Sequence, residues 1–244
     1  MTYNYYRKGG YSIGSEDYRW EIVKEYAGPT AFFFFNIVFI CLAQCLLLLS
    51  VTTPTYVLLL TGRLTINSSA IPSWTAKDTV AAGLMIVLIL ISYVADQQQW
   101  DFHLAKAQYK KTAKVPPGRD RGELDRGFLS SGLWAYSRHP NFTAEQGVWV
   151  TLYVWSCLAT ETWFNWTGIG ALGYLFLFQA STWLTELLSS KKYPDYKRYQ
   201  QGVGKFLPIP GATASFPEMT SHRANGSMRN GKDAAKARER YNLR

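Results

Sequence analysis

Two pairs of residues near the middle of the sequence could carry chemistry. Asn141 and Glu145 are spaced four residues apart, so on a helix they would share one face. Arg138 and His139 stand directly before Pro140, which restrains His139 away from helical geometry and suits the first position of a helix. The pair would therefore be presented just before a helix N-terminus, which is a natural place for an anion.

Three carboxylates stand at the ends of separate apolar runs. Asp96 follows one run, Glu145 begins another and Glu186 lies near the end of a third. Ionisable groups at the edge of a membrane usually face the helix bundle or a wet cavity. We therefore expect the three carboxylates to meet at one depth, on one side of a membrane.

Arginines surround this level, and arginine is suited to bidentate binding of phosphate. Carboxylates inside a bundle with arginines at its mouth would suit a nucleotide-like cofactor that enters from the cytosol. Ordinary helix-end charges, with arginines that anchor the cytosolic side, explain the same placement equally well. The arginines proposed as cofactor contacts are Arg119, Arg121 and Arg138.

Long apolar runs predict the elements that would position these residues. The first run has no charged residue and, at about 1.5 Å per residue, would span the roughly 30 Å of a hydrocarbon core. Small residues in the fourth run, from Gly168 to Gly173, would let a neighbouring helix approach closely. The predicted spans cover residues 31–51, 78–95, 146–160 and 166–188.

The distribution of lysine and arginine predicts the orientation of these spans. The connection 97–144 and the C-terminal tail are basic, whereas the connections 62–77 and 161–165 carry few or no basic residues. Basic connections face the cytosol, so both termini are expected there. The prediction is an all-α, polytopic membrane helix bundle with about four transmembrane helices plus interfacial helices. It divides into a polar segment 1–28, a membrane domain 29–210 and a basic tail 211–244 that we expect to be disordered.

Several functional classes receive no support from the sequence. It contains no P-loop, no G-x-G-x-x-G, no H-E-x-x-H and no G-x-S-x-G motif. The three histidines lack metal-ligand spacing, and the three cysteines lie in apolar runs, so we expect neither a metal site nor a disulfide framework. The net charge of +9 has no nucleic-acid-reading module beside it, which favours contact with anionic lipid over nucleic acid.

The residues 133–145, L-W-A-Y-S-R-H-P-N-F-T-A-E, resemble the L-W-x-Y-S-R-H-P-N-Y-F-G-E signature of membrane proteins with a steroid 5-alpha-reductase-like C-terminal domain. The segment A-D-Q-Q-Q that contains Asp96 resembles the A-D-x-Q-x-x-x-F segment preceding it. Glu186 and the following K-Y-P-D-Y-x-x-Y resemble the closing pattern of that family. The resemblance covers about residues 93–208. It departs from the signature at Phe142-Thr143-Ala144, where the family has Tyr-Phe-Gly.

This resemblance implies a fold similar to that of isoprenylcysteine carboxyl methyltransferases and sterol reductases. The reductases of the family use NADPH, held near the cytosolic face. Tyr196 and Tyr199 would close the cofactor pocket, and Tyr136 could stack or hydrogen-bond there, although interfacial anchoring is an equally good interpretation of the tyrosines. The residues implied to line the pocket are Asp96, Arg138, His139, Asn141, Glu145 and Glu186.

Three functions follow as hypotheses. The first is an NADPH-dependent reductase of a lipid or steroid-like carbon-carbon double bond, in the membrane of the endoplasmic reticulum. The second is a cofactor-binding or inactive relative that serves as a subunit of a membrane complex, because the 142–144 segment is altered and no residue before the second span matches a substrate-polarising role. The third is an S-adenosylmethionine-dependent membrane methyltransferase. The expected partners are membrane lipids, a hydrophobic small-molecule substrate and other membrane proteins.

Overall fold

The structure, a computed structural model, describes residues 2–7, 9–12, 18–67 and 74–209. These residues form helices and no extended strand, with a single parallel β-bridge between Ser137 and Gly204. The tail 211–244, predicted to be disordered, lies outside the described residues. The helices in chain order are α1 (Thr2–Arg7), α2 (Tyr18–Phe35), the π-helix η1 (Asn36–Ala43), α3 (Gln44–Asn67), α4 (Ala76–Thr112), α5 (Arg121–Arg126), the 3-10 helix η2 (Gly132–Ala135), α6 (Pro140–Ala159), α7 (Gly168–Lys192) and α8 (Tyr196–Gly202).

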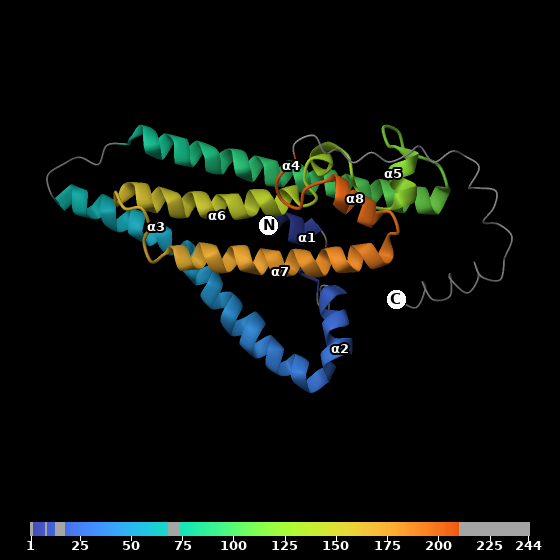
Figure 1. Cartoon of the computed structure of the whole chain (residues 1–244), viewed down its shortest axis with the longest axis horizontal. Helices are drawn as coiled ribbons and strands as arrows, with labels where there is room; N and C mark the ends of the chain where they lie inside the picture. The colour runs from blue at the N-terminus through green and yellow to red at the C-terminus, as the bar shows by residue number, and fades with distance from the viewer. Residues whose placement is uncertain (1, 8, 13–17, 68–73, 210–244) are drawn as a thin grey trace.

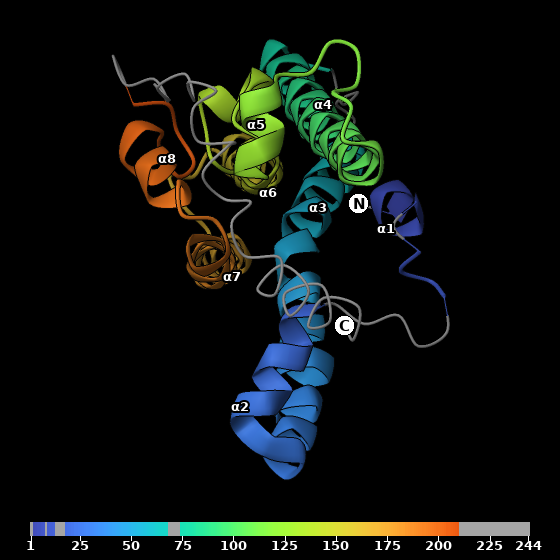
Figure 2. The ribbon, with the colours of Figure 1, turned by 90° about the vertical axis from the view of Figure 1, so that its right-hand side faces the viewer.

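The first predicted span lies in a long helical arm. The arm bends sharply at Gly28, whose φ of 76° lies outside helical geometry, and then runs through η1 into α3. Its first half diverges from the other helices, while α3 returns to lie against α6 and α7 (Figure 1, Figure 2). Residues Val23–Leu64 are long and apolar enough to cross a membrane.

The second predicted span lies in α4, the longest helix. A capping box begins it, because the Thr75 hydroxyl accepts from the Asp78 N–H and the Asp78 carboxylate accepts from the Thr75 N–H. Its 37 residues extend about 55 Å, well beyond the thickness of a hydrocarbon core. The helix is long and apolar enough to cross a membrane, and its polar C-terminal part from Asp96 onward carries the chain past the apolar stretch.

The third and fourth predicted spans lie in α6 and α7. Helix α6 runs beside α4, and α7 runs beside α6 and α3 (Figure 1). Small residues on α7 allow α3 to approach closely, as predicted. A Cβ added at Gly170 would overlap the backbone carbonyl of Ser50. The end of α3, the start of α4 and the α6–α7 connection lie at one end of the bundle, and α5 and α8 lie toward the other (Figure 1). That α6 and α7 also cross a bilayer, with both termini in the cytosol, stays a prediction.

Candidate functional site

The signature segment opens α6 as its sequence predicts. His139 is the N-cap residue, with φ −140° and ψ 61°, and Pro140 occupies the first helical turn. Just before it, the Arg138 N–H donates to the Gly204 carbonyl at 2.9 Å, beside the β-bridge of Ser137. The start of α6 is therefore fixed against the segment that follows α8.

A buried network joins this segment to α7 and α8. The Arg138 guanidinium meets the Glu186 carboxylate twice, from Nε to Oε1 at 2.7 Å and from Nη2 to Oε2 at 3.2 Å. Its Nη1 donates to the carbonyls of Gln200 and Val203 at 2.7 and 2.6 Å. The same carboxylate contacts His139 Nε2 at 3.0 Å and accepts from Gln200 Nε2 at 3.0 Å. We call Arg138, His139, Glu186 and Gln200 the Arg138–Glu186 cluster.

Every nitrogen of the Arg138 guanidinium is engaged by groups of this chain. Arg138, His139 and Glu186 are all buried, and a bidentate pair of opposite charges is the arrangement that offsets the cost of removing them from water. Four of the five N–H donors of Arg138 are used by Glu186 and the two carbonyls. In this structure the cluster therefore ties α6, α7 and α8 together.

A second group of polar residues lines a cavity of about 240 Å³ between α1, α4 and α6. Its two carboxylates are Asp96 of α4 and Glu145 of α6, and Arg7 of α1 faces them. We call it the Asp96–Glu145 cavity. Its lining residues are Tyr3, Arg7, Ile89, Ser92, Tyr93, Asp96, Glu145 and Val148.

Hydrogen bonds from neighbouring side chains hold both carboxylates in place. Asn141 Nδ2 donates to Asp96 Oδ1 at 3.0 Å, while Asn141 Oδ1 is buried and has no hydrogen-bond partner among the described residues. Glu145 Oε1 accepts from Trp149 Nε1 at 3.1 Å and from the Tyr174 hydroxyl at 3.3 Å. The unpartnered acceptor atom thus belongs to the residue that donates to Asp96, one of the cavity residues.

The guanidinium of Arg7 closes one side of the cavity. Its Nη1 donates to Gln97 Oε1 and its Nη2 donates to the Asp96 carbonyl, both at 2.8 Å. The guanidinium also lies over the Trp100 ring, 4.8 Å from its centroid. These contacts hold α1 beside α4, as Figure 2 shows.

The three predicted carboxylates therefore divide between two places. Asp96 and Glu145 share the cavity, with Asn141 beside Asp96, as the spacing of Asn141 and Glu145 predicts. Glu186 does not line the cavity and is engaged by Arg138 and His139. The signature segment 133–145 contributes to both the cluster and the cavity, because His139 contacts Glu186 of α7 whereas Glu145 lines the cavity beside α4.

The predicted tyrosines have different surroundings. Tyr196 and Tyr199 are buried in a hydrophobic cluster with Phe128 and Val203, and the Tyr199 hydroxyl donates to the Trp134 carbonyl. Burial is the main reason that the pKa of each phenol lies above its ordinary value. Tyr136 is largely exposed. None of the three lines the Asp96–Glu145 cavity.

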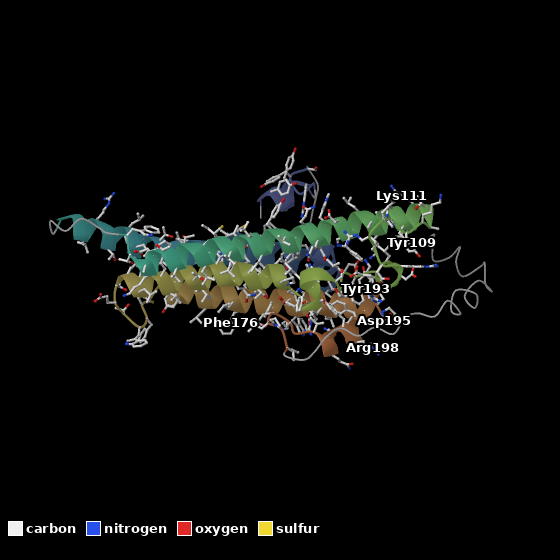
Figure 3. The ribbon with its side chains drawn as sticks, turned by 90° about the horizontal axis from the view of Figure 1, so that it is seen from above. Tyr109, Lys111, Phe176, Tyr193, Asp195 and Arg198 are labelled. Carbon is white, nitrogen blue, oxygen red and sulfur yellow. The ribbon has the colours of Figure 1, made fainter. Side chains whose placement is uncertain are left out.

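The predicted Arg119 and Arg121 lie beyond the end of the bundle. Arg121 forms an exposed ion pair with Asp125 at 3.6 Å, and Asp125 accepts from the Tyr109 hydroxyl. Tyr109 is about 20 Å along α4 from Asp96 at 1.5 Å per residue. Figure 3 shows Tyr109 and Lys111 near this end of α4, with Tyr193, Asp195 and Arg198 on the α8 side. Within the described residues, neither arginine contacts the cluster or the cavity.

Sequence reasoning missed several residues of the cavity. Ser92 and Tyr93 precede Asp96 by four and three positions, so the helical period places them on its face and could have identified them. Tyr3 and Arg7 come from a separate helix, and no local pattern links them to α4. Glu123 is a further buried carboxylate, which accepts from the Ser130 N–H at 2.6 Å and does not line the cavity.

The fold and the cavity define a helical protein with two segments able to cross a membrane and a carboxylate-lined cavity beside one of them. The chain belongs to the family described as "protein of unknown function (DUF1295)", which matches residues 1–203. It is 42% identical over 210 residues to an uncharacterized protein of Schizosaccharomyces pombe (strain 972), covering 85% of this chain and 59% of that relative. The chain thus spans about three fifths of the length of this curated relative. No solved structure matches it.

Proposed function

We propose that this chain is an NADPH-dependent reductase of a lipid or steroid-like carbon-carbon double bond, in the membrane of the endoplasmic reticulum. The resemblance of residues 93–208 to steroid 5-alpha-reductase-like domains supports the proposal at the level of sequence. The observation that carries it is the Asp96–Glu145 cavity, together with the unpartnered Oδ1 of Asn141, the residue that donates to Asp96.

The chemistry of the cavity fits one half of a nicotinamide dinucleotide. Carboxylates and an amide oxygen are hydrogen-bond acceptors, and ribose hydroxyls and a carboxamide NH₂ are donors. Asp96 and Glu145 would hold the ribose, and Asn141 would take the carboxamide after a small shift. At about 240 Å³ the cavity is smaller than the roughly 300–1,000 Å³ of typical ligand pockets, so it fits the nicotinamide riboside end alone.

Arg7 is the arginine that lines the cavity, and its guanidinium already donates to Gln97 and to the Asp96 carbonyl, so a phosphate there would share or replace these contacts. Arg7 sits at the α1 side of the cavity, and guanidinium groups suit phosphate oxygens. The proposal therefore assigns to Arg7 the phosphate-binding role that the sequence predicts for Arg119, Arg121 and Arg138.

When bound, NADPH supplies a hydride to an activated double bond. This chain would orient the reactants, since Trp149 and Tyr174 fix Glu145 and Asn141 fixes Asp96. The hydroxyl groups of Tyr3 and Tyr93 line the cavity, and either would be positioned to supply a proton to the substrate. Ile89 and Val148 give the cavity an apolar side for a hydrophobic substrate.

The test is NADPH binding by the purified full chain in detergent or nanodiscs. The variant Asn141→Ala/Glu145→Ala should bind NADPH at least about tenfold more weakly, because each lost hydrogen bond to a charged or buried group contributes about 1–3 kcal/mol. The matched control is Gln108→Ala/Asp195→Ala, which removes an amide and a carboxylate at exposed positions and should bind like wild type.

Other outcomes would replace the proposal. Equal NADPH affinity in the cavity variant and the control would show that the cavity does not hold the cofactor. Binding of S-adenosylmethionine in place of NADPH would favour a methyltransferase.

A second candidate is a subunit of a membrane complex that binds no cofactor. The observation that favours it is that every nitrogen of the Arg138 guanidinium donates to a group of this chain, which gives the signature arginine a structural role. Absence of binding of either cofactor to wild type, at concentrations that saturate related reductases, would favour this candidate.

A further inference from the structure

The connection between α6 and α7 presents three aromatic side chains outward. Trp163 is 99% exposed, Phe164 80% and Trp166 64%. Rings of this size each carry about 150–250 Å² of surface whose burial is favourable. Three of them in four residues make an apolar surface that a chain in water would bury.

This connection is held in a defined shape by its own polar groups. Asn165 Nδ2 donates to Ser156 Oγ at 3.1 Å, and Asn165 Oδ1 accepts from the N–H and hydroxyl of Thr167 at 3.0 and 2.5 Å. The Thr162 N–H donates to the Cys157 carbonyl at 3.0 Å. The polar Asn165 thus points inward while its aromatic neighbours point outward, which reverses the arrangement expected of a loop in water.

A second aromatic pair lies at the same end of the bundle. Trp74, 67% exposed, packs edge-on against Trp155 with ring centroids 6.2 Å apart. Trp155 Nε1 donates to Asp78 Oδ1 at 2.7 Å, beside the start of α4. Indole N–H groups that meet polar partners while the rings meet apolar surroundings are typical of a headgroup boundary. The turn 161–165 carries no lysine or arginine.

We infer that Trp163, Phe164 and Trp166 form an aromatic anchor that inserts at the headgroup–acyl boundary of a phospholipid bilayer. The anchor lies between the end of α6 and the start of α7. Helix α6 packs against α4, which is long and apolar enough to cross a membrane, so the occupant is lipid. The anchor stands on its own observations and does not depend on the proposed reductase function.

The anchor also sets a depth. Glu145 precedes the end of α6 by about 21 Å at 1.5 Å per residue. Since a hydrocarbon core is about 30 Å thick, the Asp96–Glu145 cavity would lie at the level of the acyl chains of the opposite leaflet.

The experiment measures tryptophan fluorescence of the full chain in phosphatidylcholine vesicles containing brominated lipids. The difference between wild type and Trp163→Tyr/Trp166→Tyr isolates the emission of the anchor. We expect this difference to be quenched at least twofold more by bromines near the headgroup end of the acyl chains than by bromines near the methyl end.

Two results would overturn the inference. An emission difference that neither lipid quenches would place the anchor in water or against protein, and stronger quenching by the deep bromines would place it inside the core. Trp134→Phe serves as the control, because Trp134 is buried within the protein and its emission should respond to neither lipid. A fold disturbed by either substitution would be detected as a changed far-ultraviolet circular dichroism spectrum, and the single variants Trp163→Tyr and Trp166→Tyr then give the same comparison.

Discussion

The Arg138–Glu186 cluster and the Asp96–Glu145 cavity lie on either side of the same helix start and treat charge in opposite ways. In the cluster, each guanidinium nitrogen and both carboxylate oxygens have partners from this chain. In the cavity, Asp96 and Glu145 line open space while each accepts hydrogen bonds from neighbouring side chains, and Asn141 Oδ1 has no hydrogen-bond partner among the described residues. A saturated network stabilises a fold, whereas an unsaturated one is available to a ligand.

Removing the charge of Glu186 tests this contrast most strongly. Glu186→Gln would leave the buried Arg138 without its counter-charge, so we expect the free energy of unfolding to fall by about 3–5 kcal/mol. Denaturant unfolding of the detergent-solubilised chain measures the loss. The matched variant Glu145→Gln removes the same charge at the cavity and should cost only about 1 kcal/mol. Equal losses in the two variants would abolish the distinction between cluster and cavity.

Alkaline pH tests the buried tyrosines of α8, Tyr196 and Tyr199, which pack beside the Arg138–Glu186 cluster. Burial raises the pKa of Tyr196 and Tyr199, so the folded chain holds both phenolic protons more tightly than the unfolded chain does. Their contribution to stability is complete below the ordinary tyrosine pKa of about 10 and is lost as the pH rises through the folded values. The free energy of unfolding should therefore fall above about pH 10, by at most about 1.4 kcal/mol per pH unit for each tyrosine.

The comparison that checks this slope uses Tyr196→Phe/Tyr199→Phe against wild type in urea unfolding at about pH 9 and about pH 11. The double variant should lose less stability over this interval. Tyr136→Phe, at a largely exposed phenol, should follow wild type. Parallel pH profiles for all three chains would show that the buried phenols do not titrate as the structure implies.

Local rules predicted the elements around both places. The proline rule placed the start of α6 at Pro140, and the four-residue spacing placed Asn141 and Glu145 on one face near Asp96. The small residues at the start of α7 correctly indicated the close approach of α3. Each of these inferences used residues that are near one another in the chain.

The hydrogen bonds that engage every nitrogen of the Arg138 guanidinium could not be predicted in the same way. Two of its partners are backbone carbonyls, of Gln200 and Val203, more than sixty residues away, and every residue type has a carbonyl. Arg7 was missed for a related reason, since its partners are the Asp96 carbonyl and the Gln97 side chain, some ninety residues later. Sequence patterns identify which side chains are polar, and only the fold decides which of them are already satisfied.

The smallest expected effect is that of Arg121→Ala, a substitution outside the Asp96–Glu145 cavity. Arg121 is exposed and pairs with Asp125 on α5, so Arg121→Ala should change the free energy of unfolding by less than about 0.5 kcal/mol. It should also leave NADPH affinity unchanged, because the ion pair lies about 20 Å along α4 from Asp96. Arg7→Ala, which removes the guanidinium of the cavity, should weaken NADPH binding severalfold in the same titration. If Arg121→Ala weakened binding as much as Arg7→Ala does, the cofactor would extend along α4 to α5, and the binding site would be larger than the Asp96–Glu145 cavity.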